Sequence, residues 1–345
     1  YLASAFYSYS AGIVSKAARV LNRNEDAEYY RNLSKEIKSA IRKEYFTETG
    51  RLAVNTQTAH VIALYMDLVP DEWKERIAFD LRMKLKQTGY HLRTGFLGTP
   101  YLCRVLSEHG SNDISYRLLT NLDYPGWLYP ITMGATTIWE RWNSVLPNGK
   151  ISDTGMNSLN HYAYGSIVEW IYRNAAGIQP VENAPGFRRF RLRPQPNYLL
   201  KSLNAEFMSP AGKIISRWNI NEDGSVSFYF RVPFNTTAEL VLPDTEGTDL
   251  QGVHELECGE YTFTYKPEKP YRKMFGADTP MSEIYQNSEA VEIVKTYLPE
   301  MTNWMLFTMM AGERSICDFI RQGLLKIDEN TLKEIDEKLS GIQAY

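Results

Sequence analysis

The sequence predicts several domains: a helical domain built as an α/α toroid, then an antiparallel β-sandwich, then a small helical tail. Helical periodicity runs from Tyr1 to about Ile178. After Gly177 apolar and polar residues alternate, as they do in half-buried strands. A length of 345 residues also allows large cores in more than one domain. The predicted domains are residues 1–178, 179–267 and 268–345.

In the helical domain, turn signals separate helices of moderate length. Asn24 is the predicted cap of the second helix, whose apolar residues form one stripe: Ala27, Tyr30, Leu33, Ile37 and Ile41. Residues 158–174 carry apolar side chains on two sides and are predicted to form a buried helix. A toroid needs both helices with one apolar stripe and helices that are apolar on two sides, because its outer ring of helices encloses its inner ring. Further helices are predicted near residues 1–22, 56–68, 71–87, 98–108, 113–122 and 137–143.

The β-domain is predicted from alternation in its strands. Residues 213–220 and 225–232 read as two strands joined by a hairpin loop that contains Gly224. Residues 238–242 and 261–265 supply further strands. No catalytic cluster is evident there, so we expect this domain to support the helical one, with independent sugar binding as the alternative.

The tail follows a link over residues 266–280 and is predicted to be helical again. A capped helix is expected to start within 279–283, and residues 331–339 form an amphipathic pattern. Methionines recur at helical spacing, which is more typical of core filling than of a recognition surface: Met301, Met305, Met309 and Met310. These residues alone assign the tail no function.

Composition excludes several classes of function. A formal net charge of −3 argues against a nucleic-acid surface, and no run of about 18 apolar residues predicts a membrane span. Cys103, Cys258 and Cys317 are scattered, odd in number and without metal-ligand spacing, which suits a reducing compartment. We therefore expect a cytoplasmic protein that uses neither a cofactor nor a metal.

One carboxylate stands out because Glu140 lies between Trp139 and Trp142 in an aromatic-rich region. A carboxylate between two indoles is poorly solvated and therefore more basic, while nearby rings offer flat faces for sugar C–H groups. This combination is typical of a site that processes glycosides. The alternative is an exposed acid at a helix end, with the two tryptophans anchoring that end to a core.

Four segments around this acid carry a family resemblance. They are TGFLGTP at 94–100, YPGWLY at 124–129, GATTIWERW at 134–142 and MNSLNHYAYG at 156–165. Together and in this order they resemble the second half of the bacterial α-L-rhamnosidases, glycoside hydrolase family 78, over about residues 1–243. The resemblance implies part of a six-hairpin (α/α)6 barrel followed by the C-terminal β-domain of that family. The remaining barrel helices would then precede Tyr1, and we expect the chain to be a fragment of a longer parent protein.

The resemblance also implies roles for individual residues. Family members hydrolyse terminal α-L-rhamnosides with inversion, and Glu140 matches the general base that activates water. His161 matches a position that hydrogen-bonds the sugar, and Trp127 and Phe96 are candidates for the apolar wall. The acid that protonates the leaving group lies upstream in the family, so we expect the chain alone to be nearly inert. The partners implied are rhamnose-containing glycosides or oligosaccharides.

Two other readings remain open at this stage. One is another (α/α)6-barrel glycosidase or an unsaturated-glycuronyl hydrolase, which would share the toroid but not the motif arrangement. The other is a non-catalytic carbohydrate-binding module, favoured if Glu140 faces bulk solvent. Homo-oligomerisation is left open by the sequence.

Overall fold

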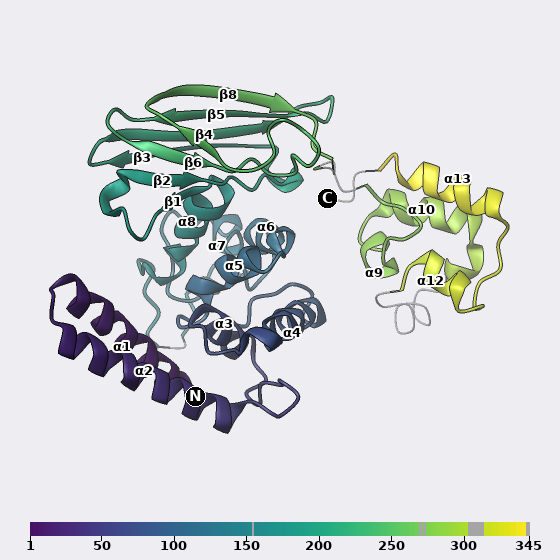
Figure 1. Cartoon of the computed structure of the whole chain (residues 1–345). Helices are drawn as coiled ribbons and strands as arrows, with labels where there is room; N and C mark the ends of the chain where they lie inside the picture. The colour runs from purple at the N-terminus through teal and green to yellow at the C-terminus, as the bar shows by residue number, and fades with distance from the viewer. Residues whose placement is uncertain (154, 269–270, 272–273, 303–313, 343–345) are drawn as a thin grey trace.

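A computed structural model describes the chain except for residues 154, 269–270, 272–273, 303–313 and 343–345. It divides into helices, a pair of stacked sheets and a helical tail beside them, in the predicted order (Figure 1). The order expected from the sequence, a helical domain followed by a β-sandwich and a helical tail, is confirmed. None of the described helices is both long and apolar enough to cross a membrane.

The first two helices form an antiparallel hairpin, α1 (Leu2–Val20) and α2 (Asn24–Tyr45). Small side chains let the two backbones approach closely, and the buried hydroxyls of Ser8 and Ser34 each donate to the other residue's carbonyl, at 3.0 and 2.8 Å. The predicted stripe of α2 is buried or half-buried. Asn24 is the first helical residue rather than the cap, because Arg23 occupies the cap position.

Shorter helices complete this domain. They are α3 (Gln57–Tyr65), the 3-10 turn η1 (Asp71–Trp73), α4 (Lys74–Gln87), α5 (Thr99–Glu108), α6 (Asn112–Thr120) and α7 (Tyr129–Thr132). After a long irregular segment come η2 (Ala163–Ser166), α8 (Ile167–Trp170) and the π-turn η3 (Ile171–Ala175). Most of α3 is buried, and its start is capped by the Thr56 hydroxyl, which accepts from the Ala59 N–H.

One predicted helix is wrong, and another is shorter than expected. Residues 137–143 contain no helix. The predicted 158–174 helix begins only at Ala163, because residues 158–162 are irregular, and then runs through η2, α8 and η3 to Ala175. This segment is also less buried than expected, since Leu159 and Val168 are exposed. The physical reason is that backbone groups of the two segments bond to each other instead of to their own helical turns.

The β-domain consists of two four-stranded sheets. One has the order β1 (Ile178–Pro180), β2 (Arg189–Leu192), β6 (Thr237–Leu240), β7 (His254–Leu256). The other has the order β3 (Ser202–Ser209), β4 (Gly212–Ile220), β5 (Val226–Val232), β8 (Gly259–Tyr265), with 3-10 turns η4 (Pro185–Phe187) and η5 (Tyr198–Leu200) before β2 and β3. The alternation predicted for β5 is confirmed, since Val226, Phe228, Phe230 and Val232 are all buried. The sandwich is not wholly antiparallel, because β2 pairs with β6 in parallel.

The helical and β-domains share one hydrophobic core. Two side chains of β4 reach across the junction: the Trp218 indole N–H donates to the Ala175 carbonyl at 2.9 Å, and the Ser216 hydroxyl donates to the Ala176 carbonyl at 2.6 Å. From the other side, the Tyr116 hydroxyl donates to the Gln195 carbonyl at 2.7 Å. Buried polar groups that are paired in this way fix how the two domains meet.

The tail has a core of its own. It contains α9 (Met281–Ile284), α10 (Ser288–Tyr297), η6 (Pro299–Thr302), α12 (Ile316–Arg321) and α13 (Glu329–Leu339). Met301 is buried in that core as expected, whereas Met305, Met309 and Met310 lie outside the described residues. One polar contact to the helical domain is the bond from the Arg117 guanidinium to the Gln286 side-chain oxygen, at 3.2 Å.

The start of α12 makes the stability of the tail sensitive to acid. The Ser315 N–H and hydroxyl donate to the Asp318 carboxylate and hold its pKa below the ordinary value. A carboxyl whose pKa is lower in the folded than in the unfolded state stabilises the folded state. This stabilisation is complete when the pH is above the unfolded pKa of about 3.9, and it is lost as the pH falls through the folded pKa. We expect the protection of the α12 amides, measured against the intrinsic exchange rate at each pH, to fall below about pH 4. Asp318→Asn should flatten that pH dependence in hydrogen-exchange mass spectrometry. Glu289→Gln, in the first turn of α10, should leave it unchanged.

Candidate active site

Two of the motif segments lie side by side because their backbones pair. The His161 N–H donates to the Ile138 carbonyl at 2.8 Å, and the Glu140 N–H donates to the Ser158 carbonyl at 2.9 Å. The Thr137 hydroxyl adds a bond to the Leu159 carbonyl. The pairing explains why residues 137–143 are not helical and brings Glu140 and His161 into one local structure.

The Glu140 carboxylate is held by a backbone donor. Its Oε2 accepts from the Ser158 N–H at 2.8 Å, and the residue is half-buried. Its neighbours in the sequence, Trp139 and Trp142, are both buried. Within the described part of the chain, no cation forms an ion pair with this carboxylate. The side chain is thus oriented by a hydrogen bond and left with one oxygen available for further chemistry.

The loop that supplies the Ser158 N–H is itself fixed. Arg141 donates from Nε to the Met156 carbonyl at 3.3 Å and from Nη2 to the Gly155 carbonyl at 3.2 Å. The Asn157 amide donates to the carbonyls of Ser144 and Ser152, at 3.2 and 3.0 Å. The orientation of Glu140 therefore depends on a network of polar contacts within 141–158.

His161 lies in a cleft of about 990 Å³ beside this structure. The lining residues are Phe96, Pro100, Thr137, Ile138, Asn160, His161, Tyr162, Ala163, Gly165 and Ser166. The Phe96 and His161 rings are stacked, with centroids 5.0 Å apart and planes within 11°. The half-buried imidazole accepts at Nδ1 from the Ala163 N–H at 3.3 Å. This bond places the ring hydrogen on Nε2, where it can donate to a ligand.

Trp127 lies behind the cleft rather than in its wall. It is 8% exposed, its indole N–H donates to the Tyr164 carbonyl at 2.9 Å, and its ring meets Trp142 edge-on. Trp142 in turn stacks on Tyr164 at 3.8 Å, and Tyr164 lies 5.1 Å from Phe96. Desolvation by this packing raises the pKa of the Tyr164 phenol. The aromatic cluster of Trp127, Trp142 and Tyr164 thus packs against Phe96 through the Tyr164 ring.

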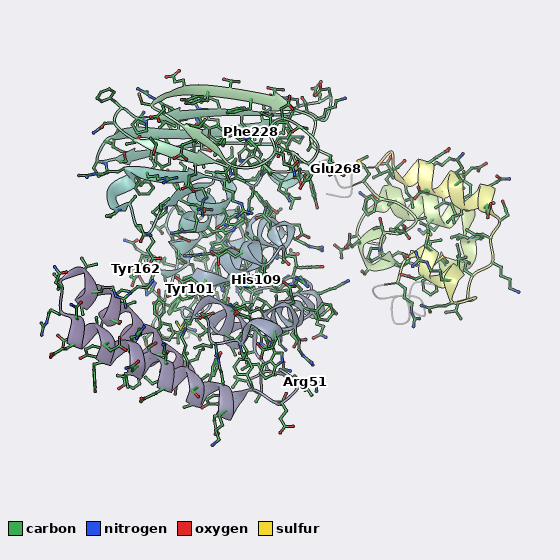
Figure 2. The ribbon with its side chains drawn as sticks, viewed as in Figure 1. Arg51, Tyr101, His109, Tyr162, Phe228 and Glu268 are labelled. Carbon is green, nitrogen blue, oxygen red and sulfur yellow. The ribbon has the colours of Figure 1, made fainter. Side chains whose placement is uncertain are left out.

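The structure therefore separates the four candidate residues. Phe96 and His161 line the cleft, Glu140 lies on the paired segment next to it, and Trp127 is buried beneath it. Sequence reasoning missed Tyr162, which also lines the cleft and is 89% exposed at the surface of the helical domain (Figure 2). A signal for it was its place inside the MNSLNHYAYG motif, directly after His161.

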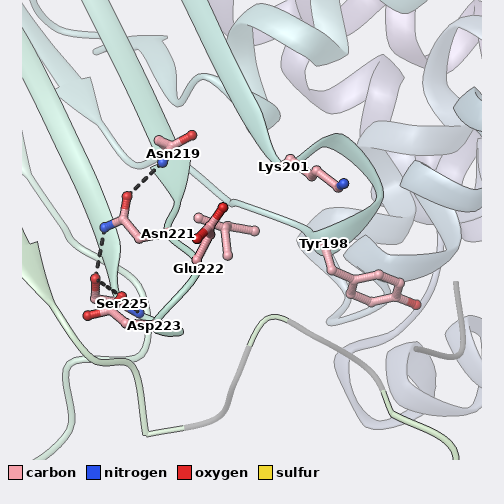
Figure 3. A pocket seen from close by; sticks show the side chains of 8 residues that line it. Tyr198, Lys201, Asn219, Asn221, Glu222, Asp223 and Ser225 are labelled. Atoms are coloured by element: carbon pink, nitrogen blue, oxygen red, sulfur yellow. Dashed lines mark hydrogen bonds between the residues drawn. The ribbon is translucent and has the colours of Figure 1, made fainter. Parts of the chain in front are cut away.

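A second hollow, on the β-domain, is mainly polar. Asn219, Asn221 and Ser225 form a chain of hydrogen bonds along one wall, while Tyr198 and Lys201 lie on the opposite side (Figure 3). These bonds hold the loop between β4 and β5 in place. The amide donors of that wall are largely used within the loop, so we assign the hollow a structural role.

No group of three or more histidine, cysteine, aspartate or glutamate side chains within the described ranges is arranged to hold a metal ion. The first cleft itself offers an imidazole donor and aromatic faces, and the Glu140 carboxylate lies on the paired segment next to it.

Comparisons with known proteins agree on what this chain is similar to. Residues 1–175 match the model of the bacterial alpha-L-rhamnosidase 6 hairpin glycosidase domain, and residues 177–257 match that of the bacterial alpha-L-rhamnosidase C-terminal domain. An alpha-L-rhamnosidase of Streptomyces avermitilis is 40% identical over 276 residues, which are 76% of this chain and 26% of that protein. One of Formosa agariphila is 40% identical over 252 residues, 72% of this chain and 27% of that protein.

Solved structures give the same result. The Streptomyces avermitilis alpha-L-rhamnosidase complexed with L-rhamnose aligns with a TM-score of 0.70 at 38% identity, over 76% of this chain and 26% of that one. The native rhamnosidase of Aspergillus terreus aligns with a TM-score of 0.71 at 32% identity, over 75% of this chain and 30% of that one. The chain thus spans about a quarter of the length of its curated relatives.

Proposed function

We propose that this chain, which belongs to the bacterial α-L-rhamnosidase family, supplies the water-activating part of a site that hydrolyses terminal α-L-rhamnosides with inversion. The observation that carries the proposal is the Glu140 carboxylate, fixed by the Ser158 N–H and paired through its backbone segment with the segment of His161. A base must be oriented before it can take a proton from water in the transition state. Relatives named alpha-L-rhamnosidase support the substrate class.

In the proposed reaction, the free carboxylate oxygen of Glu140 accepts a proton from a water molecule. The water oxygen forms a bond to the anomeric carbon as the bond from that carbon to the leaving oxygen breaks, and a second carboxyl protonates the leaving oxygen. The two carboxyl groups of an inverting site are about 6.5–9.5 Å apart, which leaves room for the water. We propose that the second carboxyl comes from the parent protein outside this chain, so that the chain alone is inactive.

The sugar would be held in the cleft by His161 and Phe96. The imidazole offers its Nε2–H to a ring hydroxyl, and the exposed side of Phe96 offers an apolar surface for sugar C–H groups. Trp127 would act indirectly, by supporting Tyr164 and through it Phe96. These contacts fit a rhamnose-containing glycoside because such a ligand has both hydroxyl and apolar faces.

A second candidate is a carbohydrate-binding module without catalysis. One observation favours it: His161 and Phe96 line the cleft, but Glu140 is not among its lining residues. Rhamnoside binding without turnover in the parent protein would support this second function.

The role of His161 can be measured in the parent protein. We expect His161→Ala to raise the KM for an aryl α-L-rhamnoside about tenfold, because one hydrogen bond to the sugar is worth about 1–1.5 kcal/mol. His254→Ala, in the β-domain, is the matched control and should leave the KM unchanged. An unchanged KM in His161→Ala would remove this residue from the sugar site.

A further inference from the structure

Ser158 contacts Glu140 at both its backbone and its carboxylate. The Ser158 N–H donates to Glu140 Oε2 at 2.8 Å, and the Ser158 carbonyl accepts from the Glu140 N–H at 2.9 Å. Ser158 itself is exposed, so little packing holds this donor in place. Of the described residues 155–160, Asn157 is the only one that is not exposed. The position of the donor therefore depends on how Asn157 is held.

The Asn157 side chain is bound to two buried serines. Its Nδ2 donates to the Ser144 carbonyl at 3.2 Å and to the Ser152 carbonyl at 3.0 Å. These serines are 0% and 7% exposed, and the Ser152 N–H donates to the Ser144 carbonyl at 2.9 Å, so both acceptors lie at the base of one small hairpin, residues 144–152. The Asn157 Oδ1 is buried and accepts no hydrogen bond within the described part of the chain. The carboxamide thus acts through its two N–H groups, and its orientation is fixed, because a flip would turn Oδ1 toward two carbonyl oxygens.

The same hairpin is tied to the chain directly after Glu140. The Ser144 hydroxyl donates to the Arg141 carbonyl at 3.0 Å and lies 3.2 Å from the Arg141 N–H, from which it accepts. One hairpin therefore positions both partners of the contact. Ser144 holds the segment that carries Glu140, and Asn157 holds the segment that carries Ser158.

The segment of His161 is anchored without Asn157. The His161 N–H donates to the Ile138 carbonyl at 2.8 Å, and the Thr137 hydroxyl donates to the Leu159 carbonyl. These bonds do not involve the hairpin. We therefore expect a change at Asn157 to move the donor to the carboxylate while the imidazole stays in the cleft.

We propose that Asn157 is a positioning residue for the general base, an inference that rests on the function proposed above. It acts through Ser158 and not on the substrate itself. Its two N–H groups hold the Ser158 N–H against Glu140 Oε2, so the carboxylate keeps one orientation while it takes the proton from water. Catalysis depends on such orientation, and a misplacement of about 1 Å can cost about 10²-fold in rate.

Asn157→Asp in the parent protein tests this role, because it keeps the shape of the side chain and replaces both donors with an oxygen that faces two carbonyl oxygens. We expect kcat for an aryl α-L-rhamnoside to fall about 10–100-fold and KM to stay unchanged. Asn148→Asp is the matched control and should leave kcat unchanged. Asn148 is exposed at the tip of the same hairpin, and aspartate keeps the Oδ1 that accepts from the Lys150 N–H. An equal loss of kcat in both variants would overturn the proposal, since the added charge and not the lost donors would then be the cause.

A double variant with Glu140→Gln separates positioning from a merely structural role. If Asn157 acts through Glu140, adding Asn157→Asp to Glu140→Gln should lower kcat no further, because the base is already absent. A further loss as large as in the single variant, or an unchanged kcat in Asn157→Asp, would refute the positioning role and leave Glu140 as the base. Full turnover in Glu140→Gln would refute the proposed function, and the positioning role with it. If Asn157→Asp fails to fold, Asn157→Ala removes both donors without adding charge and allows the same comparison.

Discussion

Glu140→Gln in the parent protein is expected to lower the rate of hydrolysis of an aryl α-L-rhamnoside by about 10²–10⁴-fold, the usual contribution of a general base. The amide keeps the shape of the carboxylate and can still accept from the Ser158 N–H, but it cannot take a proton from water. Binding of L-rhamnose should therefore change little while kcat falls steeply. The measurements are steady-state kinetics and a calorimetric titration of the same variant.

Glu169→Gln provides the control for this prediction. Glu169 is an exposed carboxylate of the same domain and is paired with Arg173. Both residues lie on the helical segment that follows the cleft residues in the sequence. We expect its replacement to leave kcat within about twofold, as surface substitutions usually do. A Glu140→Gln protein that keeps full turnover would show that this carboxylate is not the base.

The stereochemistry of the first product gives an independent check on the same assignment. If Glu140 activates a water on the face opposite the leaving group, NMR should detect the β anomer of the free sugar before mutarotation. A first product with the α configuration would require Glu140 to act in a different mechanism.

Gly177→Ala is expected to destabilise the junction of the helical and β-domains by about 3 kcal/mol or more. Gly177 has a φ of +79°, and a Cβ built there would lie 2.1 Å from the Pro194 backbone nitrogen. Neither backbone can move easily, because the Arg193 N–H donates to the Gly177 carbonyl and the adjoining Ala175 and Ala176 carbonyls accept from Trp218 and Ser216. Urea unfolding followed by tryptophan fluorescence measures the loss, since Trp170 and Trp218 are both buried near this junction.

Gly186→Ala separates the cost of a left-handed backbone conformation from the cost of a steric clash at the added Cβ. Gly186 also has a φ of +79°, but nothing lies within 4 Å of a Cβ at that position. Its replacement should cost only about 1–2 kcal/mol, the usual penalty of a left-handed conformation for alanine. Equal effects of the two substitutions would mean that the close approach at Gly177 is relieved by a backbone shift.

Elements with regular periodicity could be predicted from the sequence because their own side chains determine which face is buried. The stripe of α2 and the alternation of β5 are examples, and both lie in the structure as expected. The parallel pairing of β2 with β6 could not be predicted in this way. Those two strands are separated by more than 40 residues, and no local pattern specifies which strand a short segment will join.

The sequence by itself determined the residue types of the candidate site and, through four ordered motifs, the family to which the chain belongs. Only the tertiary structure decided where those residues lie. Phe96 and His161 are 65 positions apart but stack on each other, whereas Trp127, from an equally aromatic motif, is buried below them. The residues around Glu140 do not form the predicted helix, because their backbone groups hydrogen-bond to residues distant in the chain rather than to their own helical turns. The bond from the Glu140 N–H to the Ser158 carbonyl is one example. Periodicity reports local burial, and pairing between segments far apart in the chain overrides it.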